Sequence, residues 1–177
     1  MSQPSGPAWC SRFPGSALTA DLLPDFRDRT QAFISVMKNG HASVTVSATF
    51  RPPERAYLMH WCWMIAREGY DPREVPRMSG VDIQWDHSDA KNAAAQMAST
   101  YALKFRPSLT SRHTERRAID MTIGWQGTLQ VRDFDGRLHT IASPPRDGTN
   151  PELIAVGKTF GVIKLITDPP HWSDDGR

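Results

Sequence analysis

Two segments far apart in the chain each combine a histidine with a carboxylate. His113 lies seven residues before Asp120, and Asp168 lies three residues before His171. Two imidazoles and one carboxylate are typical ligands of a hydrolytic Zn²⁺ site, because they leave a fourth tetrahedral position open for water. A further carboxylate near such a site can take a proton from that water and return it to the leaving group. The spacing therefore suggests a metal site, with Asp168 as the candidate general base.

The elements predicted around these residues can direct them into a common cleft. Residues 118–125 are predicted to form a strand in which Asp120 faces the cleft while its apolar neighbours face the core. The compact β-branched run at residues 162–166 predicts a second strand that leads toward Asp168 and His171. Two prolines between these two residues restrict the backbone. On spacing alone, the alternative is that Asp168 hydrogen-bonds a turn and His171 packs a C-terminal tail.

The remaining periodicities predict a mixture of helices and strands. Apolar residues recur at helical spacing in three segments, residues 25–38, 52–68 and 88–105. Strict alternation at residues 44–50 predicts a strand that ends at Arg51, residues 135–136 are typical of a hairpin turn, and residues 150–151 start a short helix. The chain has no regular strand–helix–strand alternation and no glycine-rich phosphate loop. We therefore expect an α+β fold with a small, mainly antiparallel sheet flanked by helices.

Length and composition limit the possible classes of protein. The chain has 177 residues, 39% of them apolar, and a formal net charge of +2. These values predict one globular domain with one core, and they argue against a disordered or polyelectrolyte-binding chain. We expect residues 1–20, rich in Pro, Gly and Ser, to form a flexible N-terminal arm, and residues 21–177 to form the domain. Cys10 and Cys62 are predicted to be free thiols.

The sequence also bears on location. No apolar run reaches the length needed to cross a bilayer, so we expect no membrane partner. Residues 1–15 contain prolines and glycines where a Sec signal needs a continuous apolar segment. The expectation is cytoplasmic synthesis without a Sec signal.

Four segments resemble a known family of zinc peptidases. Residues 111–120 are similar to its motif S-x-H-x-x-G-x-A-x-D, and residues 168–172 are similar to its motif D/E-x-x-H-W/F, in the same order. Residues 47–53 resemble the strand-end segment of the family, and residues 156–162 resemble the stretch before its last histidine. The family is that of the D-alanyl-D-alanine carboxypeptidases and VanX-like peptidases, which includes phage L-alanyl-D-glutamate endopeptidases.

The resemblance implies a Hedgehog/DD-peptidase-like fold and a role for individual residues. The zinc ligands implied by it are His113, Asp120 and His171. Asp168 is implied as the general base, and Arg51 as a residue that contacts substrate and stabilises the oxyanion. Ser111 is expected to position the loop or the substrate, and Trp172 to form a wall of the cleft. The family has glycine where this chain has Arg116, so the loop must accommodate a side chain there.

These expectations define a leading hypothesis and two alternatives. The first is a monomeric zinc metallopeptidase that hydrolyses an amide bond in the peptidoglycan stem peptide, of D-Ala-D-Ala carboxypeptidase or L-Ala-D-Glu endopeptidase type, in phage or prophage lysis or in wall remodelling. The second is a catalytically weak or inactive peptidoglycan-binding or phage structural module that retains the metal, for which Arg116 is the main support. The third, a nucleic-acid-binding protein, lacks a basic stripe and is disfavoured.

Overall fold

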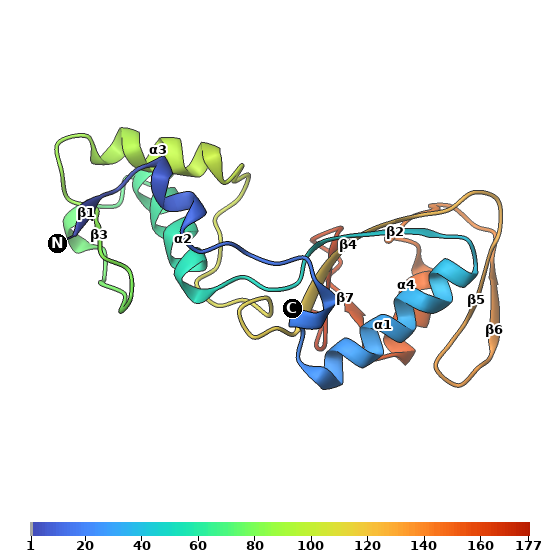
Figure 1. Ribbon diagram of the computed structural model, residues 1–177. Coiled ribbons are helices and arrows are strands. Elements are labelled where there is room, and N and C mark those ends of the chain that lie inside the picture. The colour runs from blue at the N-terminus through green and yellow to red at the C-terminus, as the bar shows by residue number, and fades with distance from the viewer. Residues whose placement is uncertain (1) are drawn as a thin grey trace. The chain divides into compact units, whose positions relative to one another are not determined.

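The computed structural model describes residues 2–177 (Figure 1). Contacts between Cα atoms divide the chain into two compact units. The first contains the N-terminal residues up to Gly15 together with Arg51–Thr114, and the second contains Ser16–Phe50 with Glu115–Arg177. The sequence predicts one core, whereas the buried apolar residues form two clusters, one in each unit.

The second unit is built on a four-stranded sheet. Its strand order is β2 (Ser43–Ala48), β4 (Ala118–Gly124), β8 (His171–Ser173) and β7 (Ile163–Lys164), and all three pairs are antiparallel. This unit also contains η2 (Thr19–Asp21), α1 (Pro24–Asn39), α4 (Pro151–Thr159) and a separate hairpin of β5 (Leu129–Arg132) and β6 (Leu138–Ile141). The α+β class with an antiparallel sheet is confirmed.

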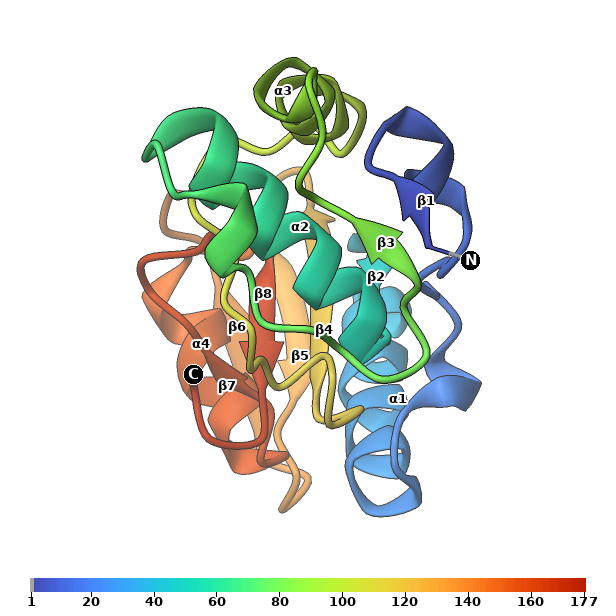
Figure 2. The ribbon, with the colours of Figure 1, turned by 90° about the vertical axis from the view of Figure 1, so that its left-hand side faces the viewer.

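Alternation in β4 separates the core from the polar face of this sheet. Ile119, Met121 and Ile123 are buried in the cluster that includes Phe33 of α1, whereas Thr122 is exposed. Figure 2 shows β4 and β8 lying side by side. The period of two predicted for this segment is therefore observed, and it leaves the side chains of the other face available to a site.

The first unit is mainly helical. It contains η1 (Pro7–Ser11), α2 (Pro53–Arg67), η3 (Pro72–Glu74) and α3 (Ala90–Thr100), together with a short parallel pair of β1 (Gln3–Pro4) and β3 (Ile83–Gln84). Trp9 and Cys10 are buried in its core beside Leu58 and Met97. Part of the segment predicted as a flexible arm is thus ordered, because these two side chains have an apolar surface to pack against.

Element boundaries differ from the sequence predictions where the chain reverses direction. The helix expected at residues 88–105 ends at Thr100, since Tyr101 caps it and Ala102 has a φ of 52°. The strand expected at residues 162–166 is limited to Ile163–Lys164. In residues 2–177, no helix is both long and apolar enough to span a membrane.

Candidate metal centre

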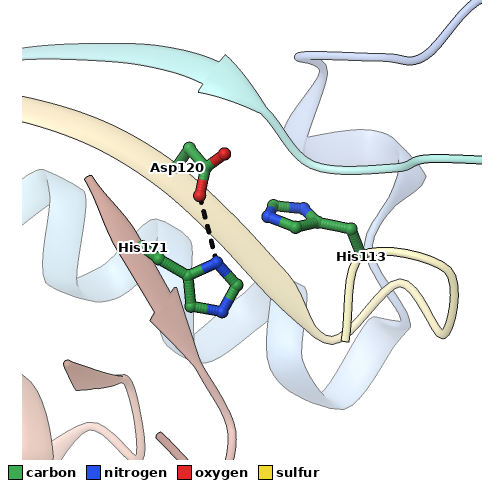
Figure 3. A group of neighbouring side chains, drawn as sticks. All are labelled: His113, Asp120 and His171. Atoms are coloured by element: carbon green, nitrogen blue, oxygen red, sulfur yellow. Dashed lines mark hydrogen bonds and ion pairs between the residues drawn. The ribbon is translucent and has the colours of Figure 1, made fainter. Parts of the chain in front are cut away.

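Three of the predicted site residues come together in space (Figure 3). His113 lies in the loop before β4, Asp120 lies within β4, and His171 is the first residue of β8. One ligand atom from each lies within 4.8 Å of the others. His113 and His171 are 2% and 6% exposed, respectively. Two nearly buried imidazoles beside a partly buried carboxylate form a group that can hold a metal ion.

Strand pairing aligns two of the three residues. In the antiparallel register of β4 and β8, Asp120 lies opposite His171. Side chains at opposed positions point to the same face of a sheet and lie within a few ångströms of each other. The Met121 N–H donates to the Pro170 carbonyl oxygen at 2.8 Å, so the pairing continues beyond the first residue of β8. The carboxylate and the imidazole are thus aligned by backbone hydrogen bonds.

Both ring nitrogens of His171 face oxygen atoms. Nδ1 lies 3.2 Å from Asp120 Oδ1, and Nε2 lies 3.1 Å from the Arg177 carbonyl oxygen. A neutral imidazole has one N–H and can donate to only one of them. If Nε2 donates to Arg177, the Nδ1 lone pair faces the Asp120 carboxylate, and a proton or a metal ion must lie between the two atoms to make that contact favourable. The contact fits either an Nδ1–H hydrogen bond to the carboxylate or coordination of one cation by both atoms.

Hydrogen bonds of the Ser111 and Thr114 hydroxyls and of the Arg51 backbone fix the loop that presents His113. The Ser111 hydroxyl accepts a hydrogen bond from the His113 N–H at 3.2 Å, and the Thr114 hydroxyl donates to the Ser111 carbonyl oxygen at 2.6 Å. The Arg51 N–H donates to the His113 carbonyl oxygen at 3.2 Å. Of the two roles considered for Ser111, these bonds support loop positioning. They also bring the backbone of Arg51 next to that of the ligand.

Arg116 adopts a backbone conformation that favours glycine. Its φ is 59°, in the left-handed region, and its guanidinium carbon lies 4.5 Å from the centroid of the Phe50 ring. Its carbonyl oxygen accepts a hydrogen bond from the Leu23 N–H at 3.0 Å. A non-glycine residue in this region is strained, and the cation–π contact offsets part of that strain. Arg116 thus adopts the conformation for which glycine is best suited.

The turn between β7 and β8 encloses a buried ammonium group. Lys164 Nζ donates to the carbonyl oxygens of Leu165, Asp168 and His171. Its side chain is 5% exposed. Burial lowers the pKa of Lys164, while the negative charges of Asp168 and Asp120 oppose that shift. By binding three carbonyl oxygens, Lys164 fixes the path of the turn that leads to the ligand His171.

Lys164 was missed by sequence reasoning, although a signal was present. It is the one charged residue in the run of residues 162–166. A lysine inside a strand predicted to be buried must find acceptors or remain a costly unpaired charge. Asp168 itself lies on the exposed side of the turn and is not part of the three-residue group. Its position three residues before His171 places it on the turn that Lys164 fixes.

The expectation for Trp172 is wrong. Its side chain is fully buried, with its ring centroid 5.4 Å from that of Phe33, and it belongs to the core cluster. Trp172 pairs with Ile119, another core residue of β4. Since successive residues of a strand point to opposite faces, a ligand at position 171 directs its neighbour into the core. Trp172 therefore supports the site from behind instead of forming a cleft wall.

Most other histidines make structural hydrogen bonds, as expected. His60 Nδ1 lies 2.8 Å from the Pro107 carbonyl oxygen, and His139 Nε2 lies 2.8 Å from Asp133 Oδ2. His87 Nε2 lies 2.8 Å from the Ser5 hydroxyl, but its Nδ1 accepts from the Asp89 N–H. Nε2 of His87 is therefore the donor, so it cannot deprotonate the serine as a catalytic base.

The two cysteines are also structural. Both Cys10 and Cys62 are free and buried, as the sequence predicts. Burial raises the pKa of the Cys62 thiol to about 12. A thiol that stays protonated is a poor nucleophile and a poor metal ligand. Among the described residues, the group of His113, Asp120 and His171 is therefore the best candidate for a functional site.

No protein-family model and no curated protein matches this chain. The chemistry of the site therefore follows from its own donor atoms, two imidazoles and a carboxylate, and from their mutual distances.

Replacing Lys164 by Met should weaken metal binding, because three carbonyl oxygens of the turn lose their donor while the apolar part of the side chain is kept. We expect the Zn²⁺ dissociation constant, measured by competition with a chromophoric chelator, to rise about 10–100-fold. Lys158→Met, on the exposed side of α4, is the control and should leave it unchanged. Unaltered affinity in a folded Lys164→Met variant would contradict the positioning role.

Two substitutions at Arg116 separate backbone strain from the contact with Phe50. Both Arg116→Gly and Arg116→Ala lose the cation–π contact, but only glycine relieves the left-handed strain. We expect the glycine variant to be more stable than the alanine variant by about 1 kcal/mol in urea unfolding. Equal stability of the two variants would show that this conformation is not strained.

Proposed function

We propose that the protein is a zinc-dependent peptidase that hydrolyses an amide bond in the peptide of bacterial peptidoglycan. The observation that supports this most directly is the approach of ligand atoms from His113, Asp120 and His171 to within 4.8 Å. Metal-activated hydrolysis fits two imidazoles and one carboxylate, because this set leaves a coordination position for water.

One distance between ligand atoms agrees with the proposed metal, and all three ligand atoms lie within 4.8 Å of one another. Zinc–ligand bonds of about 2.0–2.1 Å at tetrahedral angles separate neighbouring ligand atoms by about 3.3 Å. Nδ1 of His171 and Oδ1 of Asp120 are 3.2 Å apart. When bound, zinc would lower the pKa of a water ligand to about 7 and polarise the scissile carbonyl. The mixed nitrogen and oxygen donor set also fits zinc better than Ca²⁺ or Mg²⁺, which prefer oxygen ligands alone.

Residues of the chain supply the remaining steps. The carboxylate of Asp168, on the exposed side of the turn before His171, is proposed to accept the proton of the attacking water and to return it to the leaving amine. Arg51, whose N–H is bonded to the His113 carbonyl oxygen, is proposed to bind a substrate carboxylate or the developing oxyanion. Both side chains start from backbone segments that are hydrogen-bonded to segments bearing a ligand.

The substrate class rests on the resemblance to the D-Ala-D-Ala carboxypeptidase and VanX-like family. The positive φ of Arg116 supports that resemblance, because the motif has glycine at this position. A peptidoglycan stem peptide is the proposed substrate, with either the D-Ala-D-Ala or the L-Ala-D-Glu bond as the bond cleaved. Phage or prophage lysis is the proposed context.

The metal content of the purified protein tests the first part of the proposal. We expect about one zinc ion per chain by elemental analysis, and its loss in His113→Ala and in His171→Ala, because each variant removes one of three protein ligands. His60→Ala serves as the control, since this histidine bonds to the Pro107 carbonyl oxygen instead. A wild-type protein that takes up no zinc when zinc is supplied would exclude the proposed mechanism.

Asp168→Asn separates an enzyme from an inactive metal-containing module. The variant keeps all three ligands and should bind zinc normally, whereas it should hydrolyse peptidoglycan about 10²–10⁴-fold more slowly because the amide cannot accept a proton. Mass spectrometry of the released muropeptides measures the rate. Asp135→Asn, in the β5–β6 hairpin, is the control. Hydrolysis by Asp168→Asn at the wild-type rate would eliminate Asp168 as the base.

A further inference from the structure

The segment that follows β8 turns back onto His171. It consists of residues 174–177, and the carbonyl oxygen of Arg177 lies 3.1 Å from Nε2 of the His171 ring. The other ring nitrogen, Nδ1, lies 3.2 Å from Asp120 Oδ1, and a dashed line marks this contact in Figure 3. The imidazole of His171, which is nearly buried, therefore has an oxygen atom at each of its ring nitrogens.

Hydrogen bonds within this segment fix the position of the Arg177 carbonyl group. The Ser173 hydroxyl, which is fully buried, accepts from the Gly176 N–H at 2.8 Å and donates to Asp175 Oδ1 at 3.3 Å. The same carboxylate oxygen accepts from the Arg177 N–H at 3.1 Å. Side chains that bind backbone N–H groups two or three residues further on hold the chain in a tight turn. The turn brings the carbonyl group of Arg177 back to β8.

Gly176 allows this turn to form. Its φ is 80°, in the left-handed region, and a Cβ atom at this position would lie 2.9 Å from Cγ2 of Ile163 on β7. A side chain at position 176 would therefore be strained, and it would also push the segment away from the sheet. The contact between Arg177 and His171 depends on glycine at this position.

The start of the segment is anchored separately. The Asp174 N–H donates to the Arg117 carbonyl oxygen at 3.2 Å, and Arg117 Nη1 donates to Asp174 Oδ2 at 3.0 Å. Arg117 Nη1 also donates to Asp25 Oδ2 at 3.1 Å. Because these bonds do not involve Gly176 or Arg177, a change at Gly176 should displace the end of the segment while its start stays bound.

A carbonyl oxygen can only accept a hydrogen bond, so its contact with His171 restricts the state of the ring. Nε2 must carry a proton for the approach of the Arg177 carbonyl oxygen at 3.1 Å to be a hydrogen bond. While Nε2 holds that proton, the nitrogen lone pair that can bind a metal ion is that of Nδ1. Nδ1 is also the nitrogen that faces the Asp120 carboxylate. The Arg177 carbonyl group therefore favours the ring nitrogen that can share an ion with Asp120.

We propose that Arg177 is a positioning residue, whose carbonyl oxygen holds the Nε2–H of His171 and thereby directs Nδ1 toward the metal ion. A backbone carbonyl group in this role fixes the orientation of the ring and makes the histidine a better ligand. The inference rests on the proposed function, since it assigns the zinc contact of His171 to Nδ1. It does not involve the Arg177 guanidinium, which bonds to the Asp175 carboxylate.

NMR of the zinc-loaded protein tests the state of the ring directly. Correlations between the carbon-bound ring protons and the ring nitrogens identify which nitrogen of His171 bears a proton. We expect a protonated Nε2 and an Nδ1 without a proton, because the first donates to Arg177 and the second binds the metal. A zinc-loaded protein in which Nδ1 carries the proton, or in which Nε2 carries none, would overturn the proposal.

Two glycine variants provide an independent test. Gly176→Ala should move the Arg177 carbonyl group away from His171, so we expect the Zn²⁺ dissociation constant to rise about 10–100-fold and the Nε2 proton to exchange faster with water. Gly136→Ala, in the β5–β6 hairpin, is the matched control. Gly136 has a φ of 84°, and a Cβ atom there would meet no atom within 4 Å, so this variant introduces the same backbone strain away from the site.

Arg177→Ala is the second control, because it removes the guanidinium and keeps the carbonyl group. We expect Gly136→Ala and Arg177→Ala to bind zinc as the wild type does. Equal zinc affinities of Gly176→Ala and Gly136→Ala would refute the positioning role. If Gly176→Ala does not fold, the ring state of His171 in the wild type decides.

The outcomes distinguish this inference from the function on which it rests. Zinc bound through Nδ1 of His171, in a protein that does not cleave peptidoglycan, would retain the positioning role and reject the peptidase. Cleavage of peptidoglycan by a protein whose zinc affinity is insensitive to Gly176→Ala would retain the peptidase and reject the positioning role. A wild-type protein that takes up no zinc would reject both.

Discussion

The group of side chains proposed to hold a metal depends above all on the antiparallel register of β4 and β8. That register sets Asp120 opposite His171, so that a carboxylate oxygen and an imidazole nitrogen from distant parts of the chain lie 3.2 Å apart. A shift of one residue would direct one of the two side chains into the core. Trp172 secures the register, because its large buried side chain fits only the apolar face. Core packing thereby fixes the geometry of a polar site.

Two sets of hydrogen bonds between side chains and the backbone hold the segments next to this strand pair. Lys164 collects three carbonyl oxygens within the turn before β8, and the Ser111 hydroxyl accepts from the N–H of the ligand His113. Each satisfies polar groups that would be costly if buried without a partner. A preorganised donor set binds a cation with little further loss of conformational entropy. The ligands are thus arranged by hydrogen bonds in the protein before any ion is considered.

The same prolines that shape the turn also affect the neighbouring strand edge. The Pro170 carbonyl oxygen accepts a hydrogen bond from the Met121 N–H, but proline has no N–H to donate in return, and the edge of β4 beyond it is bridged by Asp147 opposite Gly124. Arg116 has a φ of 59°, a left-handed conformation in which glycine is less strained than other residues.

The sequence by itself determined the features that depend on residues close together along the chain. Alternation in residues 118–125 assigned Asp120 to the polar face, and residue types and motif order singled out the two histidines that lie beside it in the structure. Only the tertiary structure decided the burial of Trp172, the role of Lys164 and the packing of Trp9 into a second core. These depend on contacts between residues distant in sequence, and local periodicity contains no information about which acceptor a lysine reaches or which surface covers an aromatic ring.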